Sequence, residues 1–411
     1  MNTNTLLIGI DISLKNNHVV VLDSSKKKLA SFSVTNDLPG ARLLKEKLLQ
    51  FASSHDTTHI KIGMEATSLY WWHLYQFLVQ DEILGKFSLE VYTLNPKLVK
   101  RFHDSLSELD KTDPIDAEVI AEYIGLGKVK LSHVIDDVYE PLKRLTRFRY
   151  HLVKNLITEK NYFLLHLFLK YSAWQQLDPF SNDFGATAHE FISEYDAEEL
   201  LLKPIADLTV RITDLSRGRV IDPDKTAKLL HTIAQNSYQL KKTYKEPIDL
   251  ILANTYDNIK YFEGKIKTLD TVIEKEYGRF PDTLRTIPGI GLVFAAGIMS
   301  EVGNPTRFSK QSAIGKFAGL AWKKSQSSEF DAEETPRKPG NTYLRYYLVQ
   351  AASSLHVHNE EYKQYYERKY QESHKHRHKR ALVLTARKLA RLCFAMLRDQ
   401  RLYNSTGQRK E

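Results

Sequence analysis

Short apolar runs dominate the first 140 residues and predict a small α/β domain. Near-continuous or alternating apolar positions over about four to eight residues are typical of strands. Runs of this kind cover residues 6–12, 18–23, 28–34, 59–65 and 89–94. Helical periodicity covers residues 38–52 and 69–79, which separate the later strands. Three closely linked strands followed by strand–helix units predict a mixed sheet.

From residue 141 onward the strand signal fades and helical periodicity replaces it. Residues 142–168 form a long periodic stretch without Gly or Pro, residues 178–223 predict several short helices, and residues 359–402 predict a last long helical region. Between them, apolar positions step alternately by four and three through Ile248, Leu252, Thr255, Ile259, Phe262, Ile266, Leu269 and Ile273. This spacing fits a coiled coil with another helix, and it equally fits one amphipathic helix on its own core.

The chain has 411 residues, and these patterns divide it into three expected domains, 1–140, 141–280 and 281–411. Hydrophobic residues make up 42% and charged residues 27%, which is a globular composition and excludes a disordered chain. The single cysteine, Cys393, excludes a disulfide framework and a cysteine-based zinc site, and favours a reducing, cytoplasmic location. We expect neither a signal peptide nor a membrane span, because no apolar run is long enough.

The charge of the chain is unevenly distributed. The net charge of +9 combines a front of −4 over residues 1–140 with a tail of +8 over residues 356–411. A basic tail behind an acidic front predicts a polyanion-binding end and a separate acidic functional site.

Four acidic residues are the main candidates for that acidic site. Asp11 and Glu65 each end a predicted strand, and Asp113 and Asp116 open a predicted helix around Pro114. Turn formation and helix capping could explain each residue singly, with Asp113 as N-cap and Asp116 favouring the helix dipole. Together, two strand-end acids and a helical pair match how an RNase H-like fold gathers carboxylates. Such an oxygen-rich cluster suits Mg²⁺.

Two segments of the third domain are candidates for nucleic-acid contact and chemistry. Pro288-Gly289-Ile290-Gly291 precedes an apolar run and predicts a helix-hairpin-helix-like element, in which Gly289 and Gly291 let phosphate reach the backbone; a tight interhelical turn is the alternative. Ser325, Ser327 and Ser328 lie in a predicted loop without a local base, so their spacing alone does not support a nucleophile.

The remaining phosphate-contact candidates are mostly basic side chains near this loop and in the tail. Near the loop they are Lys323, Lys324, Arg337, Lys338, Asn341 and Arg345. In the tail they are Lys375, Arg377, Lys379, Arg380, Arg387 and Lys388, on an expected helix that includes the run 374–380. A solvated turn and helix start is the alternative interpretation of residues 337–341 and Arg345.

An ordered set of motifs resembles a known family over nearly the whole chain. The motifs are Ile8-Gly9-Ile10-Asp11-Ile12-Ser13, Met64-Glu65-Ala66-Thr67, Asn95-Pro96, Lys111-Thr112-Asp113 with Asp116-Ala117, Ile287-Pro288-Gly289-Ile290-Gly291, Phe317-Ala318-Gly319-Leu320, Gln326-Ser327, Lys338 with Gly340-Asn341, Leu344-Arg345 and Ala386-Arg387-Lys388-Leu389. The set resembles the DEDD transposases of bacterial insertion sequences, the insertion-sequence one-ten family. This family includes Piv-type DNA invertases and bridge-RNA-guided recombinases.

The resemblance implies an N-terminal RuvC-like (RNase H-like) α/β domain, a helical coiled-coil region for assembly, and a mostly α-helical C-terminal transposase domain. It implies that Asp11, Glu65, Asp113 and Asp116 form a tetrad for Mg²⁺, with two ions expected and Mn²⁺ as a substitute. Ser327 would attack DNA and form a serine–phosphate intermediate. The implied partners are donor and target DNA, a structured guide RNA, and further copies of the chain in a dimer or tetramer.

This sequence departs from the family pattern at two places. Ser328 follows Ser327 where the family usually has Gly, so Ser325 and Ser328 compete for the nucleophile's role. Thr67-Ser68 stands where the family usually has Thr-Gly.

Three other functions are compatible with parts of the sequence. A RuvC-like nuclease or junction resolvase would use the tetrad with water as the nucleophile. A non-catalytic RNA- or DNA-binding scaffold would use the acids only as caps. A sugar-kinase-like ATPase also opens with Ile8-Gly9-Ile10-Asp11, but no Gly/Thr-rich phosphate loop follows Asp11 and the basic tail would have no role there.

Overall fold

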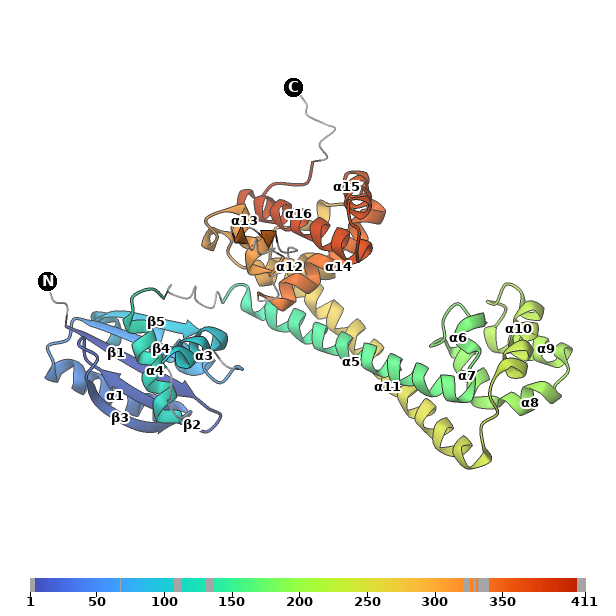
Figure 1. Ribbon diagram of the computed structural model, residues 1–411, viewed down its shortest axis with the longest axis horizontal. Coiled ribbons are helices and arrows are strands. Elements are labelled where there is room, and N and C mark those ends of the chain that lie inside the picture. The colour runs from blue at the N-terminus through green and yellow to red at the C-terminus, as the bar shows by residue number, and fades with distance from the viewer. Residues whose placement is uncertain are drawn as a thin grey trace, which may run out of the picture. The chain divides into compact units, whose positions relative to one another are not determined.

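The computed structural model describes residues 4–66, 68–106, 112–129, 137–320, 326–327, 330–331 and 340–404. The chain forms two compact units, residues 1–134 and 135–411. The first unit holds a mixed sheet with helices, and the second is mostly helical (Figure 1). The expected α/β start and helical remainder are therefore confirmed.

The sheet of unit 1 has the strand order β3-β2-β1-β4-β5. Its strands are β1 (Thr5–Ile12), β2 (Asn16–Leu22), β3 (Lys28–Thr35), β4 (His59–Glu65) and β5 (Ser88–Leu94). The first three pair antiparallel, whereas β4 runs parallel to both β1 and β5. These bounds confirm all the predicted strands to within about two residues.

Helices α1, α3 and α4 of unit 1 begin where the sequence supplies a capping residue or proline, whereas α2 begins without either. They are α1 (Leu38–Ser54), α2 (Trp72–Val79), α3 (Pro96–Ser105) and α4 (Asp113–Gly125), with a short 3₁₀ turn η1 (Leu84–Lys86). The Asp37 side chain accepts from the Gly40 amide at the start of α1, and Asn95 accepts from the Lys97 amide at the start of α3. These caps fix where each helix leaves the sheet.

A pair of glycines allows α4 to lie directly against the sheet. Gly9 on β1 and Gly63 on β4 are register partners on adjacent parallel strands. A Cβ at Gly9 would overlap the carbonyl oxygen of Ala117 on α4, and a Cβ at Gly63 would lie 2.9 Å from methyl carbons of Ile120 and Ile124. The absence of both side chains therefore sets how closely α4 approaches β1 and β4.

Gly9→Ala is expected to lower the free energy of unfolding of unit 1 by at least about 3 kcal/mol, because the new methyl group must displace helix backbone. Chemical denaturation of the full chain measures this. Gly85→Ala is the matched control, since a Cβ there meets no atom within 4 Å. Equal stability of the two variants would contradict the close packing of α4 on β1.

Unit 2 is built on two long helices that pack along each other, α5 (Glu140–Lys170) and α11 (Lys242–Tyr277). The chain between them forms α6 (Trp174–Leu177), α7 (Ala186–Glu194), α8 (Ala197–Leu202), α9 (Ile205–Ser216) and α10 (Pro223–Asn236). After α11 come η2 (Leu284–Thr286), α12 (Leu292–Val302), η3 (Pro305–Arg307), α13 (Gln311–Phe317), β6 (Gln326–Ser327), β7 (Phe330–Asp331), α14 (Thr342–His358), α15 (Glu360–Gln371) and α16 (Arg377–Asp399).

Groups of shorter helices lie toward the two ends of the α5–α11 pair (Figure 1), and each group shares a hydrophobic core with the pair. One core joins Phe163 and Leu167 of α5 and Ile248 of α11 to α6–α10. The other joins Leu142 of α5 and Ile273 of α11 to α12–α16. The alternating apolar positions predicted over residues 248–273, which we call the α11 seam, thus pack within the chain. Helix α11 contributes to both cores although it lies wholly inside the predicted 141–280 domain.

The C-terminal basic run was expected on one continuous helix, but the structure divides it. The run 374–380 straddles a break, because α15 ends at Gln371, α16 begins at Arg377, and His376 takes a left-handed backbone with φ 50°. Cys393 is buried in the core of α12–α16. None of the helices in the described ranges combines the length and apolar content that crossing a membrane requires.

Candidate catalytic site

The sheet places Asp11 and Glu65 on the face that α4 covers. Each lies two residues beyond one of the paired glycines, near the end of its strand. Because side chains alternate between faces, Asp11 emerges on the same face as Gly9, and Glu65 on the same face as Gly63. The parallel pairing of β1 and β4 therefore brings these two carboxylates to one edge of the sheet.

Helix α4 places Asp113 and Asp116 in its first turn. Ala117, the residue after Asp116, is the one that contacts Gly9, so the start of α4 lies close to the end of β1. Thr112, and not Asp113 as expected, is the N-cap residue, and its side chain makes no capping hydrogen bond. The expected capping role of Asp113 is therefore not what fixes this helix start.

Asp11 experiences the charges of the other three acids. Its pKa is raised from 3.8 to about 6, first by burial and then by Asp116, Asp113 and Glu65. Burial disfavours the charged carboxylate, and like charges nearby add to that cost. Among the described residues, this electrostatic coupling links all four sequence-predicted acids in one neighbourhood, which we call the carboxylate tetrad.

Two histidines that lie outside the predicted site residues border the tetrad. His18 is the register partner of Asp11 on β2; burial lowers its pKa while Asp113 raises it, and its ring nitrogens contact Ser33 and Ser31 at 2.9 Å. His103 on α3 places Nε2 3.7 Å from the Asp116 carboxylate, close enough for attraction but too long for a hydrogen bond. Only the tertiary packing of α3 on α4 could have revealed His103.

The tetrad fits a hard divalent cation by its chemistry. It offers carboxylate oxygens alone, and Mg²⁺ prefers a few such ligands together with water and phosphate oxygens. Across the described ranges no three His, Cys, Asp or Glu side chains are close enough to chelate an ion by themselves. Burial, and after it the mutual repulsion of the acids, raises the pKa of Asp11, and a bound cation would offset both.

Ser327 belongs to unit 2, in a two-residue strand, Gln326–Ser327, whose register partner for Ser327 is Phe330. Most of its sequence neighbourhood falls outside the described residues, including the predicted residues Lys323, Lys324, Ser325, Ser328, Arg337 and Lys338. The described flanks come close together: the Asn341 amide donates to the Phe317 carbonyl at 2.6 Å. A Cβ at Gly340, with φ 153°, would lie 2.5 Å from the Gly319 nitrogen.

The predicted hairpin contacts have internal structural roles. Gly289 has φ 92°, a conformation that favours glycine, and a Cβ there would meet the α14 backbone at Leu355, 3.3 Å away. Gly291 is the N-cap of α12, with open space around it. Only the short 3₁₀ turn η2 precedes this hairpin, so the helix-hairpin-helix remains a prediction.

The other predicted phosphate contacts fall into two groups. Asn341 and Lys388 have partners within the chain: Asn341 caps α14 and donates to Glu301, and Lys388 donates to Glu361 at 2.7 Å. The side chains at the break before α16 and in its first turn are exposed, and they are those of Lys375, Arg377, Lys379 and Arg380. Arg345 and Arg387 are partly buried. Phosphate contact by any of them remains a prediction.

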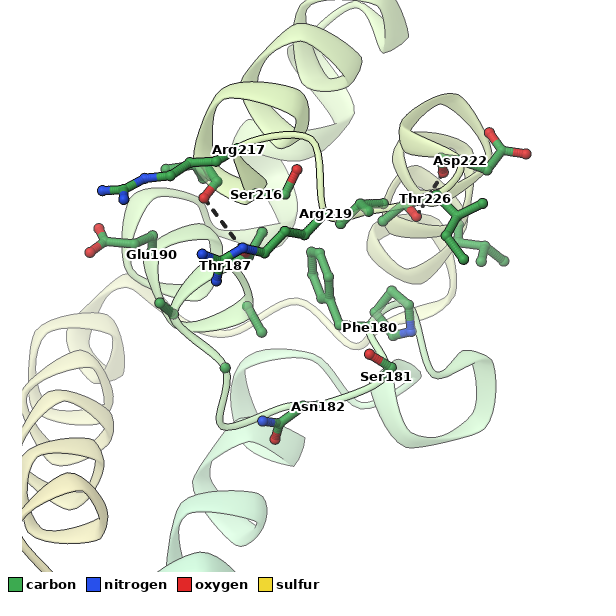
Figure 2. Close-up of a pocket in the computed structure, with 18 of the residues that line it drawn as sticks. Phe180, Ser181, Asn182, Thr187, Glu190, Ser216, Arg217, Arg219, Asp222 and Thr226 are labelled. Carbon is green, nitrogen blue, oxygen red and sulfur yellow. Dashed lines mark hydrogen bonds between the residues drawn. The ribbon is translucent and has the colours of Figure 1, made fainter. Parts of the chain in front are cut away.

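A pocket of about 880 Å³ lies among the short helices between α5 and α11, where the Thr187 hydroxyl donates to the Leu215 carbonyl (Figure 2). Both cationic and acidic side chains line it, including Arg217, Arg219, Glu190 and Asp222. Because the lining has both signs, its charge favours neither a polyanion nor a cation.

Comparison with known proteins identifies related sequences over two separate stretches. A transposase family profile of the DEDD, IS110 type matches residues 8–171, and a profile described as the transposase IS116/IS110/IS902 family matches residues 282–367. An uncharacterized 43.6 kDa protein of insertion element IS110 from Streptomyces coelicolor is 32% identical over 161 residues, which cover 38% of this chain and 39% of that protein. The match therefore spans about two fifths of this curated relative. Residues 172–281, which include the pocket, lie outside both profiles.

Proposed function

The chain belongs to the IS110 family of transposases, and from this we propose that it is a DNA transposase that cuts and rejoins DNA strands. The observation that carries the proposal is the electrostatic coupling of Asp11 to Glu65, Asp113 and Asp116 within the stretch that the transposase profile matches. Four carboxylates that share one electrostatic neighbourhood fit phosphoryl transfer better than they fit independent capping.

We propose that the carboxylate tetrad holds Mg²⁺, with Mn²⁺ as a substitute. When bound, the cation supplies charge stabilisation at the phosphate under attack. The chain's own contribution is positional: Gly9 and Gly63 let α4 approach, and α4 then sets Asp113 and Asp116 opposite the strand-end acids. His103 borders the proposed ion site, with Nε2 3.7 Å from the Asp116 carboxylate.

We further propose that Ser327 is the nucleophile. Its hydroxyl oxygen attacks a backbone phosphorus, the bond from phosphorus to the leaving deoxyribose oxygen breaks, and the serine proton ends on that leaving oxygen. The resulting serine–phosphate ester conserves the phosphodiester's energy, so a hydroxyl from a second strand can reverse the step and join new ends. Because the tetrad belongs to unit 1 and Ser327 to unit 2, the nucleophile's activators come from a different unit.

We propose that a structured guide RNA selects the DNA sites by base pairing with donor and target DNA. The exposed cations around the start of α16 would contact phosphates without reading sequence. Sequencing the RNA that copurifies with the full chain tests this part: one abundant structured species from the flank of the gene is expected, and a random sample of cellular RNA contradicts it.

A homo-oligomer is proposed to form through the outer face of α5. The α11 seam is used inside the chain, whereas the second half of α5 leaves large apolar side chains 46–57% exposed. These are Ile157, Tyr162, Leu165, Phe168 and Leu169. Their spacing puts most of them on one side of the helix, and a stripe shared by identical copies suits a self-complementary interface.

Phe168→Glu is expected to convert the oligomer to monomer, because a charge would be buried in the interface. Sedimentation velocity measures the change. Leu202→Glu is the control, since Leu202 is 85% exposed at the end of α8 and outside the stripe. An unchanged oligomer in the Phe168 variant would exclude this face.

Strand exchange between two labelled DNA duplexes, with the copurified RNA and Mg²⁺ present, is the experiment that tests the proposed function as a whole. Recombined product is expected. Cleaved but unjoined strands with free ends would favour the alternative of a metal-dependent nuclease.

A further inference from the structure

A rigid turn between α12 and α13 presents the arginine Arg307. Gly303 ends α12 with φ 59° and ψ −145°, a conformation that is essentially restricted to glycine. Asn304 then accepts hydrogen bonds from both the amide and the hydroxyl of Thr306, at 3.0 and 2.8 Å. Pro305 begins the 3₁₀ turn that Arg307 ends. The position of the Arg307 backbone is therefore tightly specified.

The guanidinium of Arg307 lies over two aromatic rings. Its central carbon is 4.7 Å from the ring centroids of both Phe308 and Phe317. The two rings meet edge to face, with centroids 5.5 Å apart. Arg307 is partly buried, and this burial lowers the pKa of its guanidinium. No carboxylate forms an ion pair with Arg307 within the part of the chain that the structure describes.

The nearest acidic charge already has its own partners. Glu301 is fully buried and receives two hydrogen bonds from Arg147, at 2.6 and 2.9 Å, and one from Asn341 at 2.6 Å. Arg147 stacks over Tyr343 much as Arg307 stacks on its rings. These two arginines thus form a matched pair, in which Arg147 is neutralised by Glu301 and Arg307 keeps a net positive charge.

The aromatic frame of Arg307 adjoins the point where the flanks of the Ser327 segment meet. Phe317 is the last residue of α13, and its carbonyl accepts the Asn341 amide that closes the segment between them. The Asn341 side chain in turn donates to Glu301, the acid whose charge Arg307 senses. Arg307 therefore lies beside the base of the chain segment that carries Ser327.

We propose that Arg307 binds a backbone phosphate of the DNA that enters at the Ser327 segment. A partly buried cation without a carboxylate is costly to the folded protein, and an incoming phosphate repays that cost. A guanidinium fork matches two phosphate oxygens, and contact with the rings of Phe308 and Phe317 restricts where that fork can lie. The proposal rests on the proposed function for its substrate, but not on the identity of the nucleophile.

Substitution of the matched arginines separates phosphate binding from a structural role. Binding of the full-length protein to a short DNA duplex of arbitrary sequence is measured over a range of salt concentrations, and thermal unfolding is followed in parallel. For Arg307→Met we expect about tenfold weaker DNA binding, a salt dependence reduced by about one counterion, and a Tm equal to or above that of the parent. Arg307→Lys should retain the salt slope but bind more weakly than the parent.

Arg147→Met is the matched control, because it leaves buried Glu301 without its arginine partner and removes no proposed phosphate contact. It should lower the Tm and leave the salt slope unchanged. Three results would overturn the proposal: an Arg307→Met variant that loses Tm as Arg147→Met does, an unchanged salt slope, or a loss confined to RNA binding. Loss of DNA binding at Arg307 with cleavage that survives Ser327→Ala would uphold the proposal while overturning the assigned nucleophile.

Discussion

Asp11→Asn is expected to reduce Mg²⁺-dependent strand exchange at least about a thousandfold, because several kcal/mol of charge stabilisation depend on the ionised tetrad. The same substitution is expected to stabilise unit 1 at neutral pH. Strand-exchange rates and denaturation of the full chain measure the two effects. Loss of activity with a gain in stability is a combination that an acid with only a capping role would not give.

The raised pKa of Asp11 determines whether the substitution stabilises or destabilises the fold at a given pH. Folding raises the pKa of Asp11 from 3.8 to about 6, so the folded protein prefers the protonated carboxyl. Stability from this group is therefore full below pH 3.8 and is lost as the pH rises to about 6. Removing the charge should therefore stabilise the fold above that pH and change almost nothing in strong acid.

Asp23→Asn is the control for the Asp11 variant. A hydrogen bond from Ser25 and others from nearby groups lower the pKa of Asp23, so its loss should weaken the fold at neutral pH and spare activity. An Asp11 variant that retained strand exchange, or that was destabilised like the Asp23 variant, would contradict the metal-binding role of the tetrad.

Ser327→Ala is expected to abolish the covalent protein–DNA adduct and strand exchange while DNA binding and Mg²⁺ affinity stay unchanged. Removing the hydroxyl removes the oxygen that forms the ester with DNA. Water could cleave a strand in its place, but it would leave no covalent intermediate from which strands are rejoined. The adduct is measured by denaturing electrophoresis with labelled DNA.

Ser325→Ala and Ser328→Ala are the matched controls, because these serines compete for the same role. Each should form the adduct at close to the parent rate. If one of them fails and the Ser327 variant does not, the nucleophile is reassigned to that position. If all three variants cleave DNA without an adduct, water is the nucleophile.

The local pattern of the sequence predicted most of the first unit. Alternating apolar runs identified the strands of the sheet, and the positions of Asp11 and Glu65 at strand ends followed from them. The approach of these two acids to α4 could not be derived from sequence spacing. It depends on Gly9 and Gly63 being register partners on adjacent parallel strands. Register of that kind is a tertiary property.

The second unit was less predictable, for the same reason. The α11 seam was visible, but its partner α5 and its division between two cores were not. The pairing of Arg147 with Glu301, and the isolation of Arg307, depend on contacts between α5, α12 and the turn after it. The basic run was expected on a helix, yet His376 adopts a left-handed backbone that separates α15 from α16.

We propose that a carboxylate tetrad and a serine act together on one DNA phosphate. Mass spectrometry of the protein–DNA adduct, trapped with Mg²⁺ and digested to peptides, tests it most directly. We expect a nucleotide ester on Ser327 in the parent and no adduct in the Asp11→Asn variant. Cleaved DNA with no modified peptide, or an adduct that forms equally well without Asp11, would contradict it.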